Sequence, residues 1–361
     1  MHTPGPNQWP TVPFGALGKG SGTNWVYVEK QKGVFDWSTL DAYVKAAQDH
    51  GVSIFYSNDD TPPWATTDPR SCRDYGYKVS CTAPPHMQDW HDFTTALVTR
   101  YKDKLIYELW NEPDTIYFTG TVADMVAMST DYYNNIRSLC PQCIILAPSG
   151  GSPYMDKFFA AGGPTGVDAI TIHSYFCNPE DVLADVDNMK AAMAKYGLSS
   201  KPLWDTEGSW GTCSLSADQQ VAFVGRYHLL NWSDGVSRFY WYMWLNSSWG
   251  YMDSGTPAAV AYTQVYNWLV GAKMMQACAA SGTTWTCGLV LASGSEALAI
   301  WDTAGSKSYT PAAQYVEYRD LSGNTVKTSG PITIGTKPVL LEMAPRSPSP
   351  ASPTNLRVTV K

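Results

Sequence analysis

Short apolar segments alternate with longer amphipathic segments along most of the chain, from residue 53 to residue 271. The apolar segments are rich in β-branched and aromatic residues and run into polar clusters, as buried strands do, and the amphipathic segments have helical spacing. The expected strands are SIFYSND (53–59), KLIYELWN (104–111), QCIILAPS (142–149), VDAITIHSYF (167–176), KPLWDTEG (201–208) and SRFYWYMWLN (237–246). Strands that alternate with helices predict a parallel sheet with helical crossovers.

Local signals mark the ends of several expected helices. Asp124 lies near the start of one helix, Ser216 has the position of an N-cap in another, and Gly197 ends a third. The expected helices span 37–51, 89–103, 121–139, 152–162, 179–197, 216–232 and 256–271.

The number of strands favours a closed barrel. A further candidate strand, VPFGALG (12–18), precedes the first helix, and only MHTP remains to supply an eighth strand. Eight βα units close into a barrel. We therefore expect an α/β fold, a (β/α)8 TIM barrel over residues 1–271 whose first strand is short or truncated.

An open doubly wound sheet is the alternative fold. It predicts a glycine-rich phosphate loop after an early strand, and GKGSG (18–22) is the only candidate. The segment that follows it, WVYVEKQKGVF, does not have the pattern of a helix start, which weakens this alternative.

The pattern changes near residue 272. Short, turn-bounded segments with alternating polarity, such as CGLVLASG (287–294), predict a small antiparallel β-sandwich domain over residues 272–345. RSPSPASP then has the composition of an extended linker, and TNLRVTVK resembles a first strand. Residues 346–361 are therefore expected to be a Pro/Ser linker and the start of a missing module, which makes an appended module possible after this linker.

Composition excludes several classes of partner. The net charge of −7 argues against nucleic acid and anionic membranes, and no window is apolar and long enough to span a bilayer. MHTPGPNQWP has no features of a signal peptide, as would also hold for a chain that begins after one.

The eight cysteines fall in pairs along the chain, Cys72 with Cys81, Cys140 with Cys143, Cys177 with Cys213 and Cys278 with Cys287. Local pairs predict disulfides that fix loops, and hence a secreted protein. CPQC (140–143) could instead be a redox or zinc element. The six histidines show no metal-ligand spacing, so we expect no metal and no cofactor.

Glutamates stand at the ends of two expected strands, in YELWNEPD (107–114) and WDTEG (204–208). Carboxylates are almost never fully buried unless paired, so Glu112 is either at the surface or held for chemistry. In a barrel both strand ends meet at one mouth, where Glu112 and Glu207 would face each other. Paired carboxylates are what cleavage of a glycosidic bond requires, whereas each alone could be a salt bridge at the rim.

LWNEPD and WDTEG resemble the corresponding motifs of clan A glycoside hydrolases, the retaining "four-seven" barrels. GVFDWSTLDAYVKAAQDHGVSIFYSNDDTPPWA (33–65) is similar to glycoside hydrolase family 39, which contains β-xylosidases, α-L-iduronidases and some endo-acting bacterial enzymes. The resemblance implies that Glu112 is the general acid/base, Glu207 the nucleophile, and Asn111 a partner of the sugar 2-hydroxyl. Desolvation by Trp110 and the charge of Glu207 would raise the pKa of Glu112.

The resemblance also implies residues that line the site. His173 and Tyr175 would do so, with Tyr175 donating to Glu207, and Trp244 would form the floor of the −1 subsite. His173 could instead be a rim histidine, and Trp244 a core residue. Clan members usually carry an arginine near the end of strand two. Lys19 stands there instead and cannot copy the arginine fork, and His2 belongs either to the mouth or to a frayed end.

Polar and aromatic residues near the strand ends complete the candidate site, namely Asp59, Trp64, Trp210 and Trp249. With the loop 68–88, the aromatic rings predict an extended cleft for several sugars and endo-action on a carbohydrate polymer or oligosaccharide. We expect retention of configuration and a carboxyl separation of about 5 to 5.5 Å. The alternatives are an exo-acting β-xylosidase-like glycosidase, a catalytically impaired carbohydrate-binding barrel, and a metal-dependent hydrolase, which would need clustered histidines and aspartates.

Overall fold

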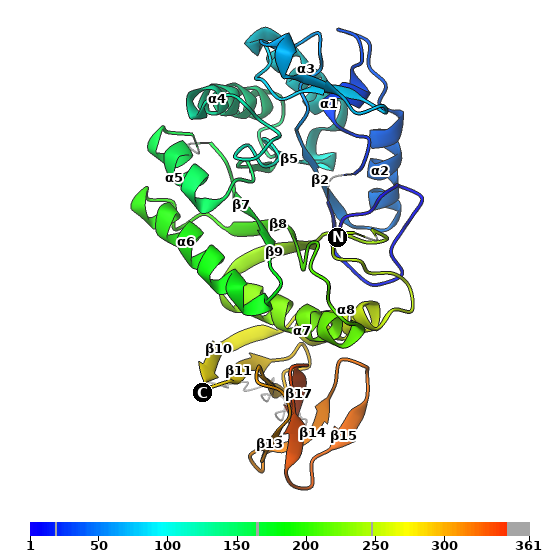
Figure 1. Cartoon of the computed structure of the whole chain (residues 1–361), viewed down its shortest axis with the longest axis vertical. Helices are drawn as coiled ribbons and strands as arrows, with labels where there is room; N and C mark the ends of the chain where they lie inside the picture. The colour runs from blue at the N-terminus through cyan, green and yellow to red at the C-terminus, as the bar shows by residue number, and fades with distance from the viewer. Residues whose placement is uncertain (19, 164–165, 247, 345–361) are drawn as a thin grey trace, which may run out of the picture. The chain divides into compact units, whose positions relative to one another are not determined.

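The computed structural model describes residues 1–344 except 19, 164–165 and 247 (Figure 1). The chain divides into two compact units, Met1–Ala259 and Val260–Lys361. Lys19 and the predicted linker and module start, residues 346–361, lie outside the described residues. Within the described part, no helix is long and apolar enough to cross a membrane.

The first unit is built on parallel strands. One sheet has the order β1-β2-β5-β6 and another the order β7-β8-β9, and neighbouring strands in both are parallel. The alternation of apolar and amphipathic segments thus correctly predicts a mixed α/β unit. The strands are β1 (Ala16–Leu17), β2 (Ser53–Ser57), β5 (Ile106–Glu108), β6 (Ile145–Leu146), β7 (Ile170–Tyr175), β8 (Leu203–Ser209) and β9 (Val236–Trp241).

Hydrogen bonds connect the two sheets at both ends. Leu146 of β6 forms a parallel bridge with Ala169, immediately before β7. At the other end, the N–H of His2 donates to the carbonyl of Trp241 over 2.9 Å, and the N–H of Gly18 donates to the carbonyl of Met1 over 2.7 Å. The first residues therefore lie between β1 and β9, and His2 is not a frayed end.

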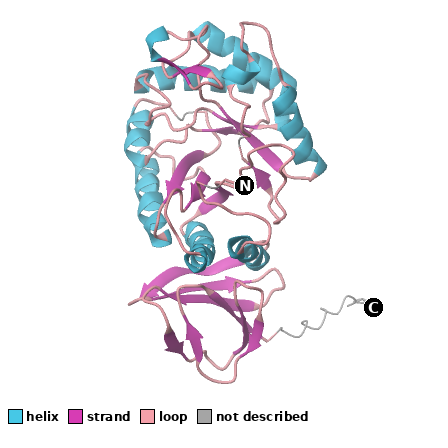
Figure 2. Cartoon of the chain, turned by 45° about the vertical axis from the view of Figure 1, so that its right-hand side comes forward, coloured by secondary structure: helices cyan, strands magenta, loops and turns pink. Residues whose placement is uncertain are grey.

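Helices lie outside these strands (Figure 2). Two begin with a capping box, in which the N-cap side chain and the third helical residue satisfy each other's backbone N–H groups. These are Thr121 with Asp124 in α4, and Ser216 with Gln219 in α7, which confirms the predicted cap at Ser216. The helices of the first unit are α1 (Trp25–Val28), α2 (Ser38–Asp49), α3 (Met87–Tyr101), α4 (Val122–Leu139), α5 (Ser152–Ala160), α6 (Val182–Lys195) and α7 (Ala217–Ser233), and most of α8 (Pro257–Leu269) belongs to the second unit.

The glycine cluster near residue 20 serves close packing. The one-turn helix α1 follows it, against the expectation that no helix starts there. A Cβ at Gly18 would lie 2.3 Å from Nε2 of His2, and one at Gly20 would lie 2.4 Å from the ring of Tyr43. These glycines give room to buried rings. Close packing therefore explains the glycine cluster without a phosphate-binding loop.

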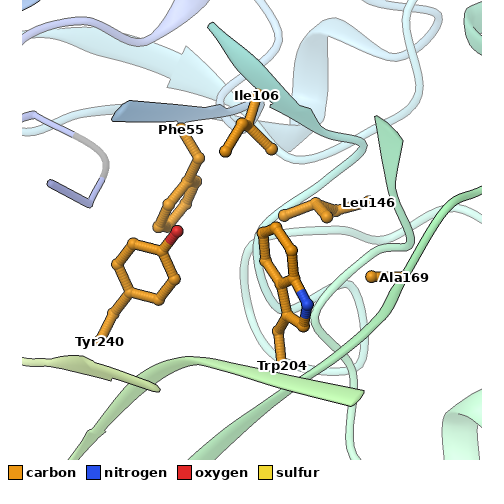
Figure 3. Close-up of a cluster of buried hydrophobic side chains, with 6 residues drawn as sticks. All are labelled: Phe55, Ile106, Leu146, Ala169, Trp204 and Tyr240. Carbon is orange, nitrogen blue, oxygen red and sulfur yellow. The ribbon is translucent and has the colours of Figure 1, made fainter. Parts of the chain in front are cut away.

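Six residues form one apolar cluster inside the first unit (Figure 3). Five come from five different strands, and Ala169 lies immediately before β7, so the strands direct their side chains towards a common interior. Burial of this apolar surface is the main favourable term for holding the strands together. The members are Phe55, Ile106, Leu146, Ala169, Trp204 and Tyr240.

The second unit is rich in antiparallel β-structure. Six strands pair in the order β10-β11-β12-β17-β14-β15, and β13 pairs with β16. Ile300, Ile334, Val339 and Leu341 form its buried cluster. The strands are β10 (Lys273–Ser281), β11 (Thr284–Val290), β12 (Glu296–Asp302), β13 (Lys307–Tyr309), β14 (Tyr315–Arg319), β15 (Thr325–Lys327), β16 (Ile332–Ile334) and β17 (Val339–Met343).

All four predicted cysteine pairs are disulfides. They join Cys72 to Cys81, Cys140 to Cys143, Cys177 to Cys213 and Cys278 to Cys287. The CPQC pair at the end of α4 is 1% exposed at both residues and closes a short loop, as a structural disulfide does.

Candidate active site

A cavity of about 570 Å³ opens where the parallel strands of the first unit end. Glu112 and Glu207 both line it, from the segment after β5 and from β8 respectively. The side chains are 24% and 12% exposed, so both carboxyl groups are partly shielded from water but remain accessible from the cavity.

Glu112 follows β5 in a conformation that few residues adopt. Its φ of +44° lies in the left-handed region, which is disfavoured for a residue with a Cβ. The N–H of the preceding Asn111 donates to the carbonyl of Asn58 over 2.8 Å, and the N–H of Glu112 donates to Oγ of Ser149 over 3.3 Å. Neighbouring strand ends thus hold a strained backbone, which is common at functional sites.

Glu207 is directed into the cavity by an irregularity in β8. The register between β7 and β8 passes from Ile172–Asp205 to His173–Glu207, so Thr206 is an extra residue on β8. Such bulges bend a strand and change the direction of its side chains. The Thr206 hydroxyl donates to Oε1 of Glu108 beneath the site over 2.8 Å.

Tyr175 donates its hydroxyl to Oε2 of Glu207 over 2.8 Å, as the sequence resemblance implies. Burial, and then the charge of Glu207, raise the pKa of Tyr175 well above its ordinary value. The phenol therefore stays protonated at neutral pH and remains a donor to the carboxylate.

His173 lies between the two carboxylates. Its Nδ1 is 2.8 Å from Oε1 of Glu112 and 3.7 Å from Oε2 of Glu207. Burial lowers the pKa of His173, but the charge of Glu207 and the hydrogen bond to Glu112 outweigh this and raise the pKa to about 9. At neutral pH the ring is therefore an imidazolium that donates to Glu112.

The three side chains form one compact group. One ligand atom from each of Glu112, His173 and Glu207 lies within 4.8 Å of the other two. Such a group has donors for a metal ion, but His173 would first have to release its proton, because only neutral imidazole binds a metal. The group is suited to proton transfer and nucleophilic attack on a bound molecule.

Two buried acids lie under this group. Glu108 and Asp205 are both 0% exposed, and burial is the main cause that raises the pKa of each. Tyr227 donates to Oδ2 of Asp205 over 3.3 Å. Raised pKa values reduce the negative charge that these acids place beneath Glu207.

The structure brings most of the predicted site residues together. The cavity that holds the two glutamates is also lined by Asp59, Asn111, Tyr175 and Trp249. His173 is connected to this cavity by its hydrogen bond to Glu112. His2 also lines it, and Nε2 of its buried ring bonds to the carbonyl of Thr206 over 2.8 Å.

Three predicted tryptophans, all within the described residues, do not line the cavity. Trp244 is 2% exposed and Trp210 is 3% exposed, with Trp210 packed edge-on against Trp241. The indole of Trp64 donates to the carbonyl of Glu29 over 2.9 Å. Trp244 is therefore a core residue rather than a subsite floor, which was the alternative for this position.

Other residues of the cavity wall were missed by the sequence analysis. Tyr242 lines the cavity two residues before Trp244, and Tyr75, Tyr77 and Lys78 line it from the loop after the strand β3 (Cys72–Asp74). The loop 68–88 was expected to contribute, but nothing in the sequence alone distinguished these side chains from others in it.

Comparisons with known proteins show what the chain is similar to. The model of the family described as glycosyl hydrolase catalytic core matches residues 89–263, the segment that carries both glutamates. No curated protein sequence matches the chain.

Solved structures of glycoside hydrolases share the fold. A family 39 glycoside hydrolase from Bacteroides cellulosilyticus is 15% identical with a TM-score of 0.76, and the match covers 92% of this chain and 76% of the other. A family 39 β-xylosidase from Caulobacter crescentus is 16% identical, with a TM-score of 0.66 and coverage of 92% and 89%. A bifunctional glucanase-xylanase from a metagenome library is 11% identical, with a TM-score of 0.63 and coverage of 95% of both chains. Residues 89–263 thus match the glycosyl hydrolase catalytic core, and the chain resembles the clan A glycoside hydrolases, family 39 in particular, as its motifs LWNEPD and WDTEG indicate.

Proposed function

We propose that this protein is a secreted retaining glycoside hydrolase that cleaves β-glycosidic bonds in a neutral polysaccharide or oligosaccharide. The observation that carries the proposal is the pair Glu112 and Glu207. Their carboxylate oxygens approach within 4.8 Å across one cavity and have different hydrogen-bond partners. So short a separation supports direct attack by one carboxylate and leaves little room for the water that an inverting enzyme places between them.

In this mechanism Glu207 is the nucleophile. Tyr175 and the charge of His173 keep its carboxylate ionised and oriented, so that it attacks the anomeric carbon and forms a glycosyl-enzyme. The leaving oxygen takes a proton from Glu112. A water molecule then enters, Glu112 removes its proton, and the hydroxide equivalent releases the sugar from Glu207 with net retention of configuration.

His173 acts on Glu112 through one oxygen. Its Nδ1–H donates to Oε1, which leaves Oε2 to carry the proton towards the leaving group. After the proton has gone, the same hydrogen bond joins an imidazolium to a carboxylate and stabilises that carboxylate, which is then ready to act as a base.

Asn111 is the proposed partner of a sugar hydroxyl. Its Oδ1 is buried and has no hydrogen-bond partner among the described residues, although the residue lines the cavity. A buried carbonyl oxygen without a partner is costly, and a sugar hydroxyl would satisfy it.

The proposed scaffold is a (β/α)8 barrel over residues 1–271 with an appended β-sandwich. The hydrogen bonds of His2 and Gly18, and the bridge between Leu146 and Ala169, support closure of the parallel strands into a ring. Eight-fold closure would direct every strand end to one mouth, where both glutamates lie. The four disulfides support a site of action outside the cell.

The test is a hydrolysis screen on xylan, mixed-linkage β-glucan and galactomannan, together with nitrophenyl β-glycosides. Wild type is compared with Glu112→Gln, Glu207→Gln and the control Glu317→Gln, which changes an equivalent group in the second unit. We expect Glu207→Gln to lose activity on every substrate. Glu112→Gln should lose roughly 10²–10⁴-fold on polymers but less in the first step on nitrophenyl substrates, whose leaving group needs no proton.

Three further readouts separate the alternatives. A glycosyl-enzyme should accumulate in Glu112→Gln with a nitrophenyl substrate and appear in the intact mass. Proton NMR should show that the first product has the configuration of the substrate, and mixed product lengths would indicate endo-action. An inverted first product would exclude the retaining mechanism, and binding of a polymer without cleavage would favour the impaired carbohydrate-binding barrel.

A further inference from the structure

A small disulfide-linked hairpin forms part of the cavity wall. Its strands β3 (Cys72–Asp74) and β4 (Val79–Cys81) are antiparallel, and the disulfide joins the directly paired residues Cys72 and Cys81. Cys81 also exchanges two backbone hydrogen bonds, of 2.9 and 3.0 Å, with Thr61 in the segment after β2. The hairpin is thus fixed at its base to the strand-end region of the unit.

The tip of this hairpin presents two tyrosine rings to the cavity. Tyr75 is 43% exposed and Tyr77 is 73% exposed, and both line the cavity that holds Glu112 and Glu207. The ring centroids lie 6.2 Å apart. Large aromatic rings left exposed beside a cavity indicate a binding surface, since covering them removes apolar area from water.

Polar and charged groups support the same tip. Lys78 forms an ion pair with Asp60, and the side-chain amide of Asn24 donates to Oδ2 of Asp60 over 2.6 Å. The ammonium group of Lys78 lies 5.6 Å from the centre of the Tyr75 ring. Lys78 and Asp60 are only 16% and 10% exposed, so this shielded pair orders the tip and places hydrogen-bonding groups next to its rings.

The charge of the cavity selects against anionic ligands. The acids Asp59, Asp60, Glu112 and Glu207 line it. Among the described residues that line it, the basic side chains are Lys78 and the imidazole of His2, and the imidazolium of His173 is paired with Glu112. Lys78 is already paired with Asp60. A uronate would therefore meet an excess of negative charge, whereas a neutral sugar would find both rings and hydrogen-bonding groups.

We propose that Tyr75 and Tyr77, backed by Lys78, Asp60 and Asn24, form a second sugar-binding subsite for a neutral unit of the chain, apart from the unit that is cleaved. The inference rests on the proposed hydrolase function and narrows its substrate to neutral glycans long enough to reach both the glutamates and the hairpin. Each ring covers the apolar face of a sugar, and the polar groups bind its hydroxyls.

The test compares a long and a short substrate. KM and kcat are measured on the neutral polysaccharide that wild type cuts fastest and on the nitrophenyl glycoside of its sugar, for wild type, Tyr77→Ala, Tyr75→Ala, Tyr75→Phe and Val79→Ala. Val79 is the matched control, because it is 44% exposed on the same hairpin but does not line the cavity. We expect each Tyr→Ala change to raise KM for the polymer about tenfold, far more than for the nitrophenyl glycoside. Tyr75→Phe should keep most of the affinity, and Val79→Ala should match wild type.

Binding without catalysis separates this proposal from the proposed function. Binding is measured as the retardation of the protein in native gels that contain mixed-linkage β-glucan, arabinoxylan or polygalacturonate. This measurement requires no cleavage of the polymer. Retardation by a neutral polymer that Tyr77→Ala abolishes, in a wild-type protein that cuts nothing, would overturn the hydrolase function and keep the subsite. Three results would overturn the subsite. The Tyr→Ala changes could raise KM equally for the polymer and the nitrophenyl glycoside, or Val79→Ala could have as large an effect as they do. The third result is stronger retardation of the protein by polygalacturonate than by the neutral polymers.

Discussion

His173 makes the stability of the site dependent on pH. Its pKa of about 9 in the folded chain lies above the ordinary value of about 6.5, because Glu207 and Glu112 outweigh the effect of burial. The folded state therefore binds a proton that the unfolded chain releases between these values. The resulting stabilisation is complete below about pH 6.5 and is lost as the pH rises through about 9.

We expect the Tm of wild type to fall between pH 6.5 and pH 9 more steeply than that of His173→Gln, measured by thermal unfolding at constant ionic strength. Glutamine keeps a donor near Glu112 but does not titrate. Equal slopes for the two proteins would show that His173 does not carry this proton.

The role of an individual residue could be predicted where its residue type is rare at such a position in a protein. An acid at the end of an apolar strand is conspicuous, so Glu112 and Glu207 were found from the sequence, and the structure places both in one cavity. A tryptophan near a strand end is equally common in the core and at the mouth, and the expectation for Trp244 was wrong for this reason. The position of His2 depends on backbone pairing with Trp241, across the whole length of the first unit, which local sequence does not reveal.

The start of α7 allows a test of the predicted cap. Oγ of Ser216 accepts a hydrogen bond from the N–H of Gln219 over 3.3 Å, and Oε1 of Gln219 accepts one from the N–H of Ser216 over 2.8 Å. Ser216→Ala removes the acceptor and should lower the free energy of unfolding by about 1 kcal/mol, measured by urea unfolding. The exposed Ser214, outside the helix, is the matched control. A loss as large in Ser214→Ala would mean that the cap contributes nothing specific.

Element type was more predictable than element detail. Hydrophobic periodicity located most of the parallel strands and the long helices, because it reflects which face is buried, but it did not predict the short strands β3 and β4. The bulge at Thr206 in β8 has no such signature, since it arises from pairing with β7. The single turn α1 is too short to show a helical period, and it was missed.

At the scale of the molecule, the change of pattern near residue 272 predicted a second, β-rich part. The structure has a compact unit from Val260 onwards in which antiparallel strands dominate. The boundary at residue 271 and the sandwich arrangement remain predictions. Contacts between strands far apart in sequence define such arrangements, and a single sequence does not list its long-range contacts.

The disulfides stabilise each of the two units separately. All are local, and none joins the two units. A disulfide restricts the unfolded chain more as the loop it closes becomes longer. Cys177–Cys213 spans 36 residues and Cys278–Cys287 spans 9, so their removal should cost about 4 and about 3 kcal/mol of unfolding free energy in their respective units.

The two disulfides should also differ in their effect on activity. Cys177 and Cys213 follow Tyr175 and Glu207 closely in sequence, so the bridge between them holds together the segments that continue from β7 and β8. We expect the double variant C177S/C213S to lose both stability and kcat/KM at temperatures where it is still folded, whereas C278S/C287S should lose stability alone. Urea unfolding and hydrolysis rates on the preferred substrate check both effects. If C177S/C213S kept full activity below its Tm, the hydrogen bonds of Tyr175 and His173 would suffice to order the site without this covalent link.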